Sequence, residues 1–297
     1  MPTSEFVTIP AVRTVPDDDV STTPLGSPAA GHIIQDAEPI TPLSIAKIIQ
    51  QSLPYSVLCY IARRLLTILL NRLLSVKAKA TPESHQKRVL RVALYILSTA
   101  MATVGSWYSV SYMQIADGIR ALPETSASEV DSKREKKSAL QKQTTSFMEF
   151  LLGYLMHDTA STIDQFREYP ADMVHHGIGM TMSILCLSRP HLLMDFVPAF
   201  LRLEGSTVAL NWMWFFREFP ILAQRFPFVD RSLPKVFVAL YASIRMVWFP
   251  WYLHHVATKY PIVWNQGLGP AGRGLFYLLH TLQTYWFGLI VQKMVVS

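Results

Sequence analysis

The stretch VLRVALYILSTAMATVGSWYSVSYM, residues 89–113, carries a single charged side chain, Arg91. The hydrocarbon core of a bilayer is about 30 Å thick, and about 20 helical residues cross it. A soluble core does not require an apolar run of this length. The stretch therefore predicts a membrane-spanning helix, and with it an all-α membrane fold.

The composition of the whole chain agrees with a membrane protein. Of its 297 residues, 50% are hydrophobic and only 16% are charged, whereas roughly a quarter are charged in a typical soluble domain. The formal net charge is +6, but Lys and Arg flank the apolar runs, as they do at membrane interfaces, so nucleic-acid binding is not indicated. Cys59 and Cys186 fall in apolar runs and are expected to be packing residues, not disulfide or metal-binding cysteines.

Applied to the rest of the chain, the same length criterion of about 20 residues per span predicts a multi-pass bundle of about six or seven membrane helices. The expected spans besides 89–113 are 147–166, 173–187, a broken region at 191–216, 235–255 and 274–294. The connection at 131–143, DSKREKKSALQKQ, is apolar-poor and predicts a solvated loop. Positions of Lys and Arg divide evenly between the two sides if seven segments cross, so the positive-inside rule leaves the orientation open.

The N-terminal part of the chain is expected to differ from the bundle. Residues 1–45 are rich in Pro, Ser, Thr and Asp, lack the apolar centre of a signal peptide, and predict a disordered tail. The next segment, 46–80, is long enough to span, yet Arg63, Arg64 and Arg72 share a polar face. It is therefore predicted either to cross the membrane or to lie in the interface.

Polar side chains recur at helical spacing inside two neighbouring spans. His157 and Asp164 share a stripe at i and i+7, with Asp158 one position round from it. His175 and His176 open the next span. Asp, Lys or Arg at the centre of a membrane helix costs about 2.5–3.5 kcal/mol on insertion scales, so such residues mark functional-site candidates.

Two later spans carry similar stripes. One contains Glu204, Thr207, Asn211 and Trp214, and the other contains Arg245 together with Trp248, Tyr252 and His255. Lipid cannot satisfy these groups, so each stripe must face protein or a wet cavity. The economical prediction is one central polar cavity within the bundle.

The histidine pair is compatible with more than one role. Histidines near carboxylates can hold zinc or a di-iron centre, but the HxxHH and HxxxH spacings of membrane oxygenases are absent and no metal is expected. Acyl transfer is a second possibility, with a histidine as base or transient nucleophile oriented by Asp158. A third is a hydrogen-bonded clamp between helices, which is worth on the order of 1 kcal/mol in membranes. Spacing alone leaves clamp and chemistry open.

The order of four motifs, GYLMHDT, DMVHHGIG, LEGSTVALNWMWFF and RMVWFPWYL, resembles the TLC domain shared by TRAM, ceramide synthase and related membrane proteins. The resemblance covers about 81–292. It implies a bundle of helices in the endoplasmic-reticulum membrane, with the histidine pair facing an interior cavity.

Within the family, the chain departs from the ceramide synthase signature at two places. Tyr169 stands where an Asp six residues before the pair is expected, and the element at 203–207, LEGST, lacks a second Asp. Glu204, Asn211 and Trp214 instead resemble the small TLC-domain-containing, transmembrane protein 56-like branch. That resemblance implies a role in membrane lipid composition.

Three functional hypotheses follow. The first is lipid homeostasis: acyl lipid, sphingolipid included, is bound or handled in the cavity, with His175, His176 and Asp158 at its centre. Substrate contacts are then expected from the remaining stripe residues, His157, Asp164, Glu204, Thr207, Asn211, Trp214 and Arg245. The second is a ceramide-synthase-like N-acyltransferase, with acyl-CoA as co-substrate and no other cofactor. The third is a structural or trafficking role. The expected partners are membrane lipids and not nucleic acid, and a homo-oligomer or a membrane-protein partner stays open.

One arginine, three histidines and one proline in the later spans have expected roles of their own. Arg245 is a candidate anchor for an anionic headgroup or thioester phosphate. His254 and His255, near Lys259, are expected at the interface, and His280 is expected to be a satisfied interhelical contact. Pro250 is expected to kink its helix.

Overall fold

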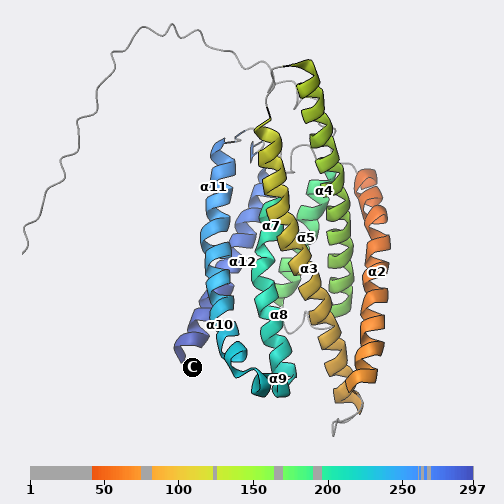
Figure 1. Ribbon diagram of the computed structural model, residues 1–297, viewed down its shortest axis with the longest axis vertical. Coiled ribbons are helices and arrows are strands. Elements are labelled where there is room, and N and C mark those ends of the chain that lie inside the picture. Colours follow the sequence, from red (N-terminus) through yellow and green to blue (C-terminus); the bar gives the residue numbers. More distant parts are fainter. Residues whose placement is uncertain are drawn as a thin grey trace, which may run out of the picture. The chain divides into compact units, whose positions relative to one another are not determined.

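The computed structural model describes residues 42–74, 82–122, 126–163, 170–189, 196–259, 261, 264–265 and 269–296. All regular secondary structure in these ranges is helical (Figure 1). The predicted all-α class is thereby confirmed. The predicted tail at 1–45 lies outside the described residues, apart from its last four, which begin the first described helix.

Long helices run alternately in opposite directions along one common axis (Figure 1). In chain order they are α2 (Pro42–Leu74), α3 (Pro82–Arg120), α4 (Ala127–Thr162), α5 (Pro170–Ser188), α7 (Val197–Leu203), α8 (Gly205–Glu218), α9 (Pro220–Arg225), α10 (Pro227–Tyr241), the π-helix η2 (Ala242–Trp248), α11 (Phe249–Lys259) and α12 (Gly269–Val296). Only Glu204 separates α7 from α8, and α10, η2 and α11 are continuous. Each of these two groups therefore acts as one long rod.

Three segments of the described chain are long and apolar enough to cross a membrane. They are Ser44–Arg72 in α2, His85–Ile119 in α3, and Pro227–Lys259 in the α10–η2–α11 rod. The first covers the segment for which spanning and interfacial placement were both predicted, and by length and composition it meets the requirement for a span. These helices support the membrane character read from the stretch at 89–113.

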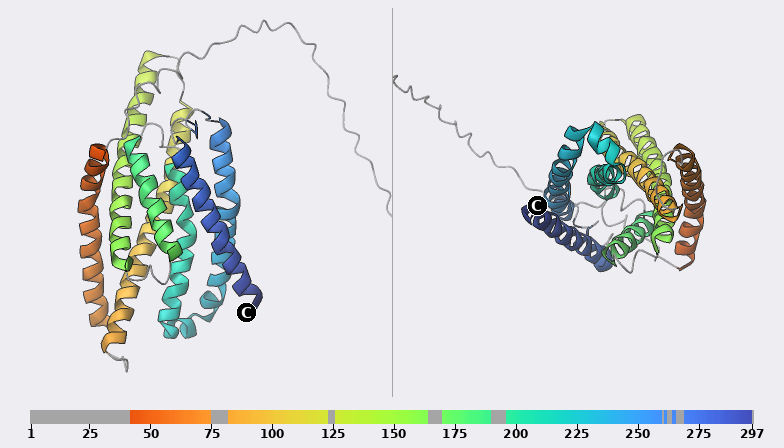
Figure 2. Two further views of the ribbon diagram at one scale, coloured as in Figure 1. Left: turned by 180° about the vertical axis from the view of Figure 1, so that it is seen from behind. Right: turned by 90° about the horizontal axis from the view of Figure 1, so that it is seen from below.

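Six of the rods close into a ring. Contacts run from α3 to α4, from α4 to α5, from α5 to α12, from α12 to η2, from α10 to α8, and from α7 and α8 back to α3. The end-on view in Figure 2 shows this ring, with α2 outside it. Every rod of the ring therefore has two neighbours within it.

The outer helix α2 packs closely on α4 because Gly153 has no side chain. A Cβ atom at Gly153 would lie 2.5 Å from the carbonyl oxygen of Ser52 and 2.6 Å from the Cβ of Tyr55. Small residues allow such close approach of membrane helices. The same region of α4 continues, one turn later, into the polar motif at His157.

Part of the ring interior is filled by aromatic side chains. Phe196, Phe249 and Phe276 are fully buried. The ring centroids of Phe196 and Phe276 are 5.3 Å apart, and those of Phe249 and Phe276 are 6.1 Å apart. These contacts hold the α7, α11 and α12 rods together where they meet.

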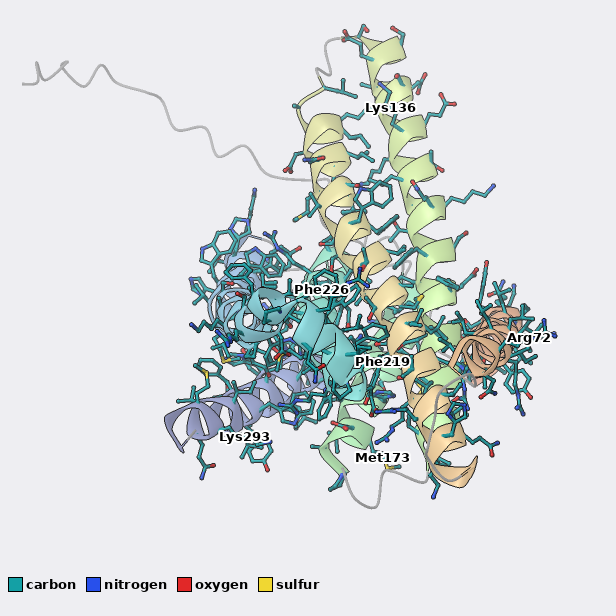
Figure 3. All side chains as sticks on the ribbon, turned by 60° about the horizontal axis from the view of Figure 1, so that its bottom comes forward. Arg72, Lys136, Met173, Phe219, Phe226 and Lys293 are labelled. Atoms are coloured by element: carbon teal, nitrogen blue, oxygen red, sulfur yellow. The ribbon has the colours of Figure 1, made fainter. Side chains whose placement is uncertain are left out.

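The prediction of a loop at 131–143 is wrong, because this segment is helical and belongs to the first half of α4. The helix begins with a capping box in which Ser126 accepts from the backbone of Glu129 and the Glu129 carboxylate accepts from the backbone of Ser126. The Lys, Glu, Gln, Ala and Leu residues that follow are strong helix formers. This half projects beyond the other helices, with Lys136 near its tip (Figure 3).

At Pro250, the structure has a π-helix directly before the proline. Proline has no N–H and its ring collides with the carbonyl four residues earlier in a regular helix. The wider turn of η2 precedes that position, and α11 begins at Phe249, so Pro250 lies in its first turn, where proline is tolerated. Isolated π-turns often occur at functional sites, and η2 carries Arg245.

Candidate functional site

The central pair of the site joins α4 to α5. His176 Nε2 lies 3.6 Å from Asp158 Oδ2, and His176 Nδ1 lies 3.1 Å from the hydroxyl oxygen of Thr159. Both nitrogens of the imidazole thus face polar atoms of α4. This arrangement orients the ring and sets which nitrogen carries the proton.

His175 is placed differently from its neighbour. Its ring centroid is 5.5 Å from that of Trp286 on α12 and 5.9 Å from that of His176. Its Nδ1 atom is buried and has no hydrogen-bond partner among the described residues. Figure 3 shows Met173, two residues earlier, at the end of the bundle away from Lys136. The histidine pair therefore lies in the half of the ring opposite the projecting part of α4.

A chain of polar groups extends from Asp158 to α8. The Tyr154 side chain lies within interaction range of Asp158 and Ser98. Asn211 Nδ2 donates to Ser98 Oγ at 2.9 Å. Glu204 lies within electrostatic range of Asp158 and Tyr154. Asp158 of α4, His176 of α5 and Glu204 and Asn211 of the α7–α8 rod thus lie near one another.

On the α2 side of α4, His157 is buried. Its Nε2 atom is 3.4 Å from the hydroxyl of Ser161, and its ring meets that of Tyr60 edge-on at 6.2 Å. Arg63 lies within electrostatic range of both His157 and Asp158. The polar face of α2 thus lies against the site helix.

Arg245 forms a separate polar cluster with the start of α8. Its Nε donates to Ser206 Oγ at 2.8 Å, and its Nη2 donates to the Leu203 carbonyl oxygen at 3.0 Å and to Thr207 Oγ1 at 3.2 Å. The guanidinium also lies 5.0 Å from the centre of the Tyr241 ring. The side chain is buried, and its Nε and Nη2 groups donate within the protein. The geometry is that of a strut between η2 and α8.

Gln283 and Ser106 were not identified from the sequence. Gln283 is completely buried on α12, and neither its Oε1 nor its Nε2 has a partner among the described residues; the same holds for Ser106 Oγ on α3. An amide in the middle of a membrane helix is itself a signal, and Gln283 stands three residues from His280, on the same face. This spacing marks a polar stripe on the last span.

His280 differs from its predicted state. It was expected to be a satisfied contact, but its Nδ1 is buried without a partner among the described residues. Its backbone carbonyl accepts from Thr284 Oγ1 at 2.9 Å. His280 also borders a groove of about 540 Å³ along α12, which continues past Thr284 to Leu289 and is mainly apolar. His280 thus links the groove to the polar stripe of α12.

The remaining predicted residues are distributed as follows. Asp164 lies outside the described residues. Trp214 is 40% exposed, and its ring stacks on that of Tyr95 at 6.5 Å, so it belongs to the α3–α8 contact at the surface of the bundle. Within the described ranges, no three His, Cys, Asp or Glu side chains come together in a way that would hold a metal ion. Cys59 and Cys186 are buried free thiols, in line with packing roles.

A helical ring with a polar interior, built from apolar helices long enough to cross a bilayer, defines a multi-pass membrane protein. A family model described as TLC domain (TRAM/LAG1/CLN8) matches residues 85–292. The chain therefore belongs to the TLC-domain family, and so to membrane proteins linked to lipid metabolism. No curated protein and no solved structure matches it significantly.

Proposed function

We propose that this protein binds acyl lipid inside the helical ring and acts in lipid homeostasis in the endoplasmic-reticulum membrane. The observation that carries the proposal is a set of buried, unpartnered polar atoms, His175 Nδ1 and the Gln283 amide, in a ring that also holds the His176–Asp158 pair. Within the family, the proposal places the chain with the small TLC-domain-containing, transmembrane protein 56-like branch.

The unpartnered polar groups lower the stability of the fold when no lipid is bound. A buried polar group without a hydrogen bond costs about 1–3 kcal/mol. The polar head of a lipid would supply donors and acceptors to Gln283 and His175, and its acyl chain would contact the apolar remainder. The apolar groove beside His280, of about 540 Å³, runs along exposed side chains of α12, and the end of such a chain would follow it out of the ring. Lipid binding would thus give hydrogen-bond partners to His175 and Gln283, and the free energy regained would contribute to the affinity.

The two histidines would then divide the work. His176 is held by Asp158 and Thr159, so it forms the fixed wall of the site. His175 has an unused ring nitrogen and would contact the ligand. Glu204 and Asn211, at the far end of the polar chain, would set the charge and alignment of Asp158.

Photocrosslinking tests this proposal. Membranes containing the protein are loaded with a photoactivatable, clickable fatty-acyl lipid, and crosslinked peptides are mapped by mass spectrometry. Labels are expected on α5 and α12, with at least a tenfold loss in the His175→Ala, Gln283→Leu double variant. The matched control is His254→Ala, an exposed histidine outside the site. Equal labelling of the double variant and the control would contradict ring binding.

An N-acyltransferase is the second candidate, favoured by the 3.6 Å contact between His176 and Asp158. Such a pair can act as a general base. In this reaction the amine of a sphingoid base attacks the carbonyl carbon of acyl-CoA, the C–N bond forms as the C–S bond breaks, and the amine proton passes through the histidine to the departing thiolate. Purified protein with both substrates should then release an N-acyl product that is lost in His175→Ala, His176→Ala. Absence of product in the unmodified protein would remove this candidate.

Cellular lipid profiles separate both candidates from a purely structural role. Cells producing the His175→Ala, His176→Ala variant at equal abundance should differ in lipid composition from cells producing the unmodified protein. Abundance must be matched because lost interhelical contacts alone can lower steady-state levels. Unchanged profiles at equal abundance would favour a structural or trafficking role.

A further inference from the structure

A second cavity lies at the other end of the bundle from the histidine pair. Its volume is about 190 Å³, and α3, α7, η2 and α11 form its walls. The side chains that matter are four aromatic residues, one carboxylate and one histidine: Tyr112, Trp248, Trp251, Tyr252, Asp117 and His255. These residues come from helices that end together at the top of Figure 1.

We infer that this cavity binds the quaternary ammonium headgroup of a membrane lipid. Aromatic faces attract cations through the quadrupole of the ring, and groups of aromatic rings recognise quaternary ammonium ions in this way. A carboxylate in the same wall adds full charge complementarity. The inference concerns a site separate from the ring interior at His175 and stands independently of the function proposed there.

The aromatic wall is ordered by internal stacking. The rings of Trp248 and Tyr252 stack at 5.1 Å, and the rings of Trp251 and His255 stack at 5.5 Å. Outside the cavity wall, the guanidinium carbon of Arg202 lies 4.5 Å from the centre of the Trp248 ring. Trp248 is thus held between Arg202 and Tyr252, and the ring faces left to a ligand are those of Tyr112, Trp251 and Tyr252.

The cavity wall also carries a carboxylate. Asp117 lines the cavity beside the aromatic side chains, and it has an interaction within the protein, as do Tyr112 and Tyr252. A carboxylate has about four lone-pair sites, so one interaction does not use all of them. A quaternary ammonium group has no N–H to donate and needs only charge and ring faces. It therefore fits a wall that combines aromatic rings with a carboxylate.

Depth and size favour a lipid headgroup. Asp117 is three residues from the end of α3 at Arg120, and His255 is four residues from the end of α11 at Lys259. Ends of membrane helices lie at headgroup level, where Trp and Tyr gather. A volume of 190 Å³ equals that of about six water molecules, which admits a compact head and excludes a long chain. Trp251, 58% exposed, borders the path that the chain would follow outside.

Binding of matched short-chain lipids tests the inference. Full-length protein is reconstituted in nanodiscs of phosphatidylglycerol, which carries no amine, and titrated with dihexanoyl phosphatidylcholine, dihexanoyl phosphatidylglycerol or free choline. Tryptophan fluorescence reports binding. We expect the phosphatidylcholine to bind at least tenfold more tightly than the phosphatidylglycerol. Binding of free choline with the same affinity would still support recognition of a quaternary ammonium group, but with soluble choline as the ligand. Weaker binding of choline would assign the site to the lipid.

Two variants and two controls locate the binding. Asp117→Asn and Trp251→Leu should each weaken phosphatidylcholine binding about tenfold, since each removes one attraction to the cation. Asp230→Asn and Trp212→Leu, an acid and an exposed tryptophan elsewhere, should leave it unchanged. Thermal unfolding without added lipid identifies any variant that fails to fold, and Trp251→Leu alone then decides, because its side chain is largely exposed. Equal affinity for the two phospholipids, or unchanged affinity in the folded variants, would overturn the inference.

Discussion

The Arg245 cluster and the His175–Gln283 region lie in the same helical ring but differ in how completely their hydrogen bonds are made. Arg245 donates to Ser206, Thr207 and the Leu203 carbonyl within 3.2 Å. In the other region, the Gln283 amide and His175 Nδ1 are buried without partners among the described residues. The sequence places both in polar stripes on apolar helices and does not distinguish them.

This difference separates two uses of buried polarity. Nearly all buried polar groups in native proteins are hydrogen-bonded, so an unpartnered one calls for a specific explanation. A satisfied cluster ties helices together and has little left to offer a ligand. The predicted role of Arg245 as an anchor for an anionic headgroup therefore has less support from the structure than ligand contact at His175 and Gln283.

Arg245→Met gives the largest expected effect. It keeps much of the side-chain volume but removes the donor to Ser206 and Thr207 and one of the two donors to the Leu203 carbonyl, so we expect a loss of about 3 kcal/mol in the free energy of unfolding. Fluorescence-monitored thermal unfolding in detergent checks this. Arg245→Lys should recover little, because one ammonium cannot replace the planar fork of donors. A variant as stable as the unmodified protein would show that the cluster is no strut.

Ser206→Ala tests the same cluster more gently. It removes the acceptor of the 2.8 Å hydrogen bond from Arg245 Nε and should cost about 1.5 kcal/mol, as for a buried hydrogen bond to a charged group. The matched control is Ser243→Ala, since Ser243 is exposed and bonds only to the backbone of its own helix. Equal melting temperatures for the two variants would contradict the prediction.

Gln283→Leu should stabilise the protein, whereas the two preceding variants should destabilise it. Replacing an unpartnered buried amide with an apolar side chain of similar size should raise the free energy of unfolding by about 1 kcal/mol in lipid-stripped detergent. The same variant should lose crosslinking to acyl lipid. Destabilisation in stripped detergent would instead mean that Gln283 is a structural residue like Ser206, and the comparison would fail.

Asp158→Asn gives the smallest expected change in stability, less than about 1 kcal/mol. The carboxylate is partly accessible and its contact with His176 is 3.6 Å long, which is typical of a weak ion pair. Its effect should appear instead in acyl-lipid crosslinking at α5, where His176 loses its orienting charge. Wild-type crosslinking together with wild-type stability would exclude Asp158 from the site.

Much of the fold was predictable because lipid imposes a simple rule on the chain. The runs at 89–113, 173–187, 235–255 and 274–294, and the described part of 147–166, are helical, since an apolar segment in a bilayer must satisfy its backbone internally. This rule does not apply to a segment in water, and the prediction of a loop at 131–143 was wrong. That charged segment is helical because of its capping box and helix-forming residues.

The candidate site was predictable only in part. Spacing placed His157 and Asp158 on one helix and the histidine pair at the start of the next, and the structure brings Asp158 to His176. Spacing also put Trp214 on a face with Asn211, yet Trp214 is 40% exposed beside Tyr95. Helical periodicity defines a face, but neighbouring helices decide which part of that face is covered.

By itself, the sequence determined that most of the chain lies in lipid, the order of its helices, and which polar residues are costly to place there. Hydropathy and periodicity are local properties of the chain. Only the tertiary structure decided that the helices close into a ring, that Nε and Nη2 of Arg245 donate to residues at the start of α8, and that the side-chain amide of Gln283 has no partner among the described residues. Hydrogen bonds between helices join residues far apart in the chain, and their presence or absence depends on distances that no single helix specifies.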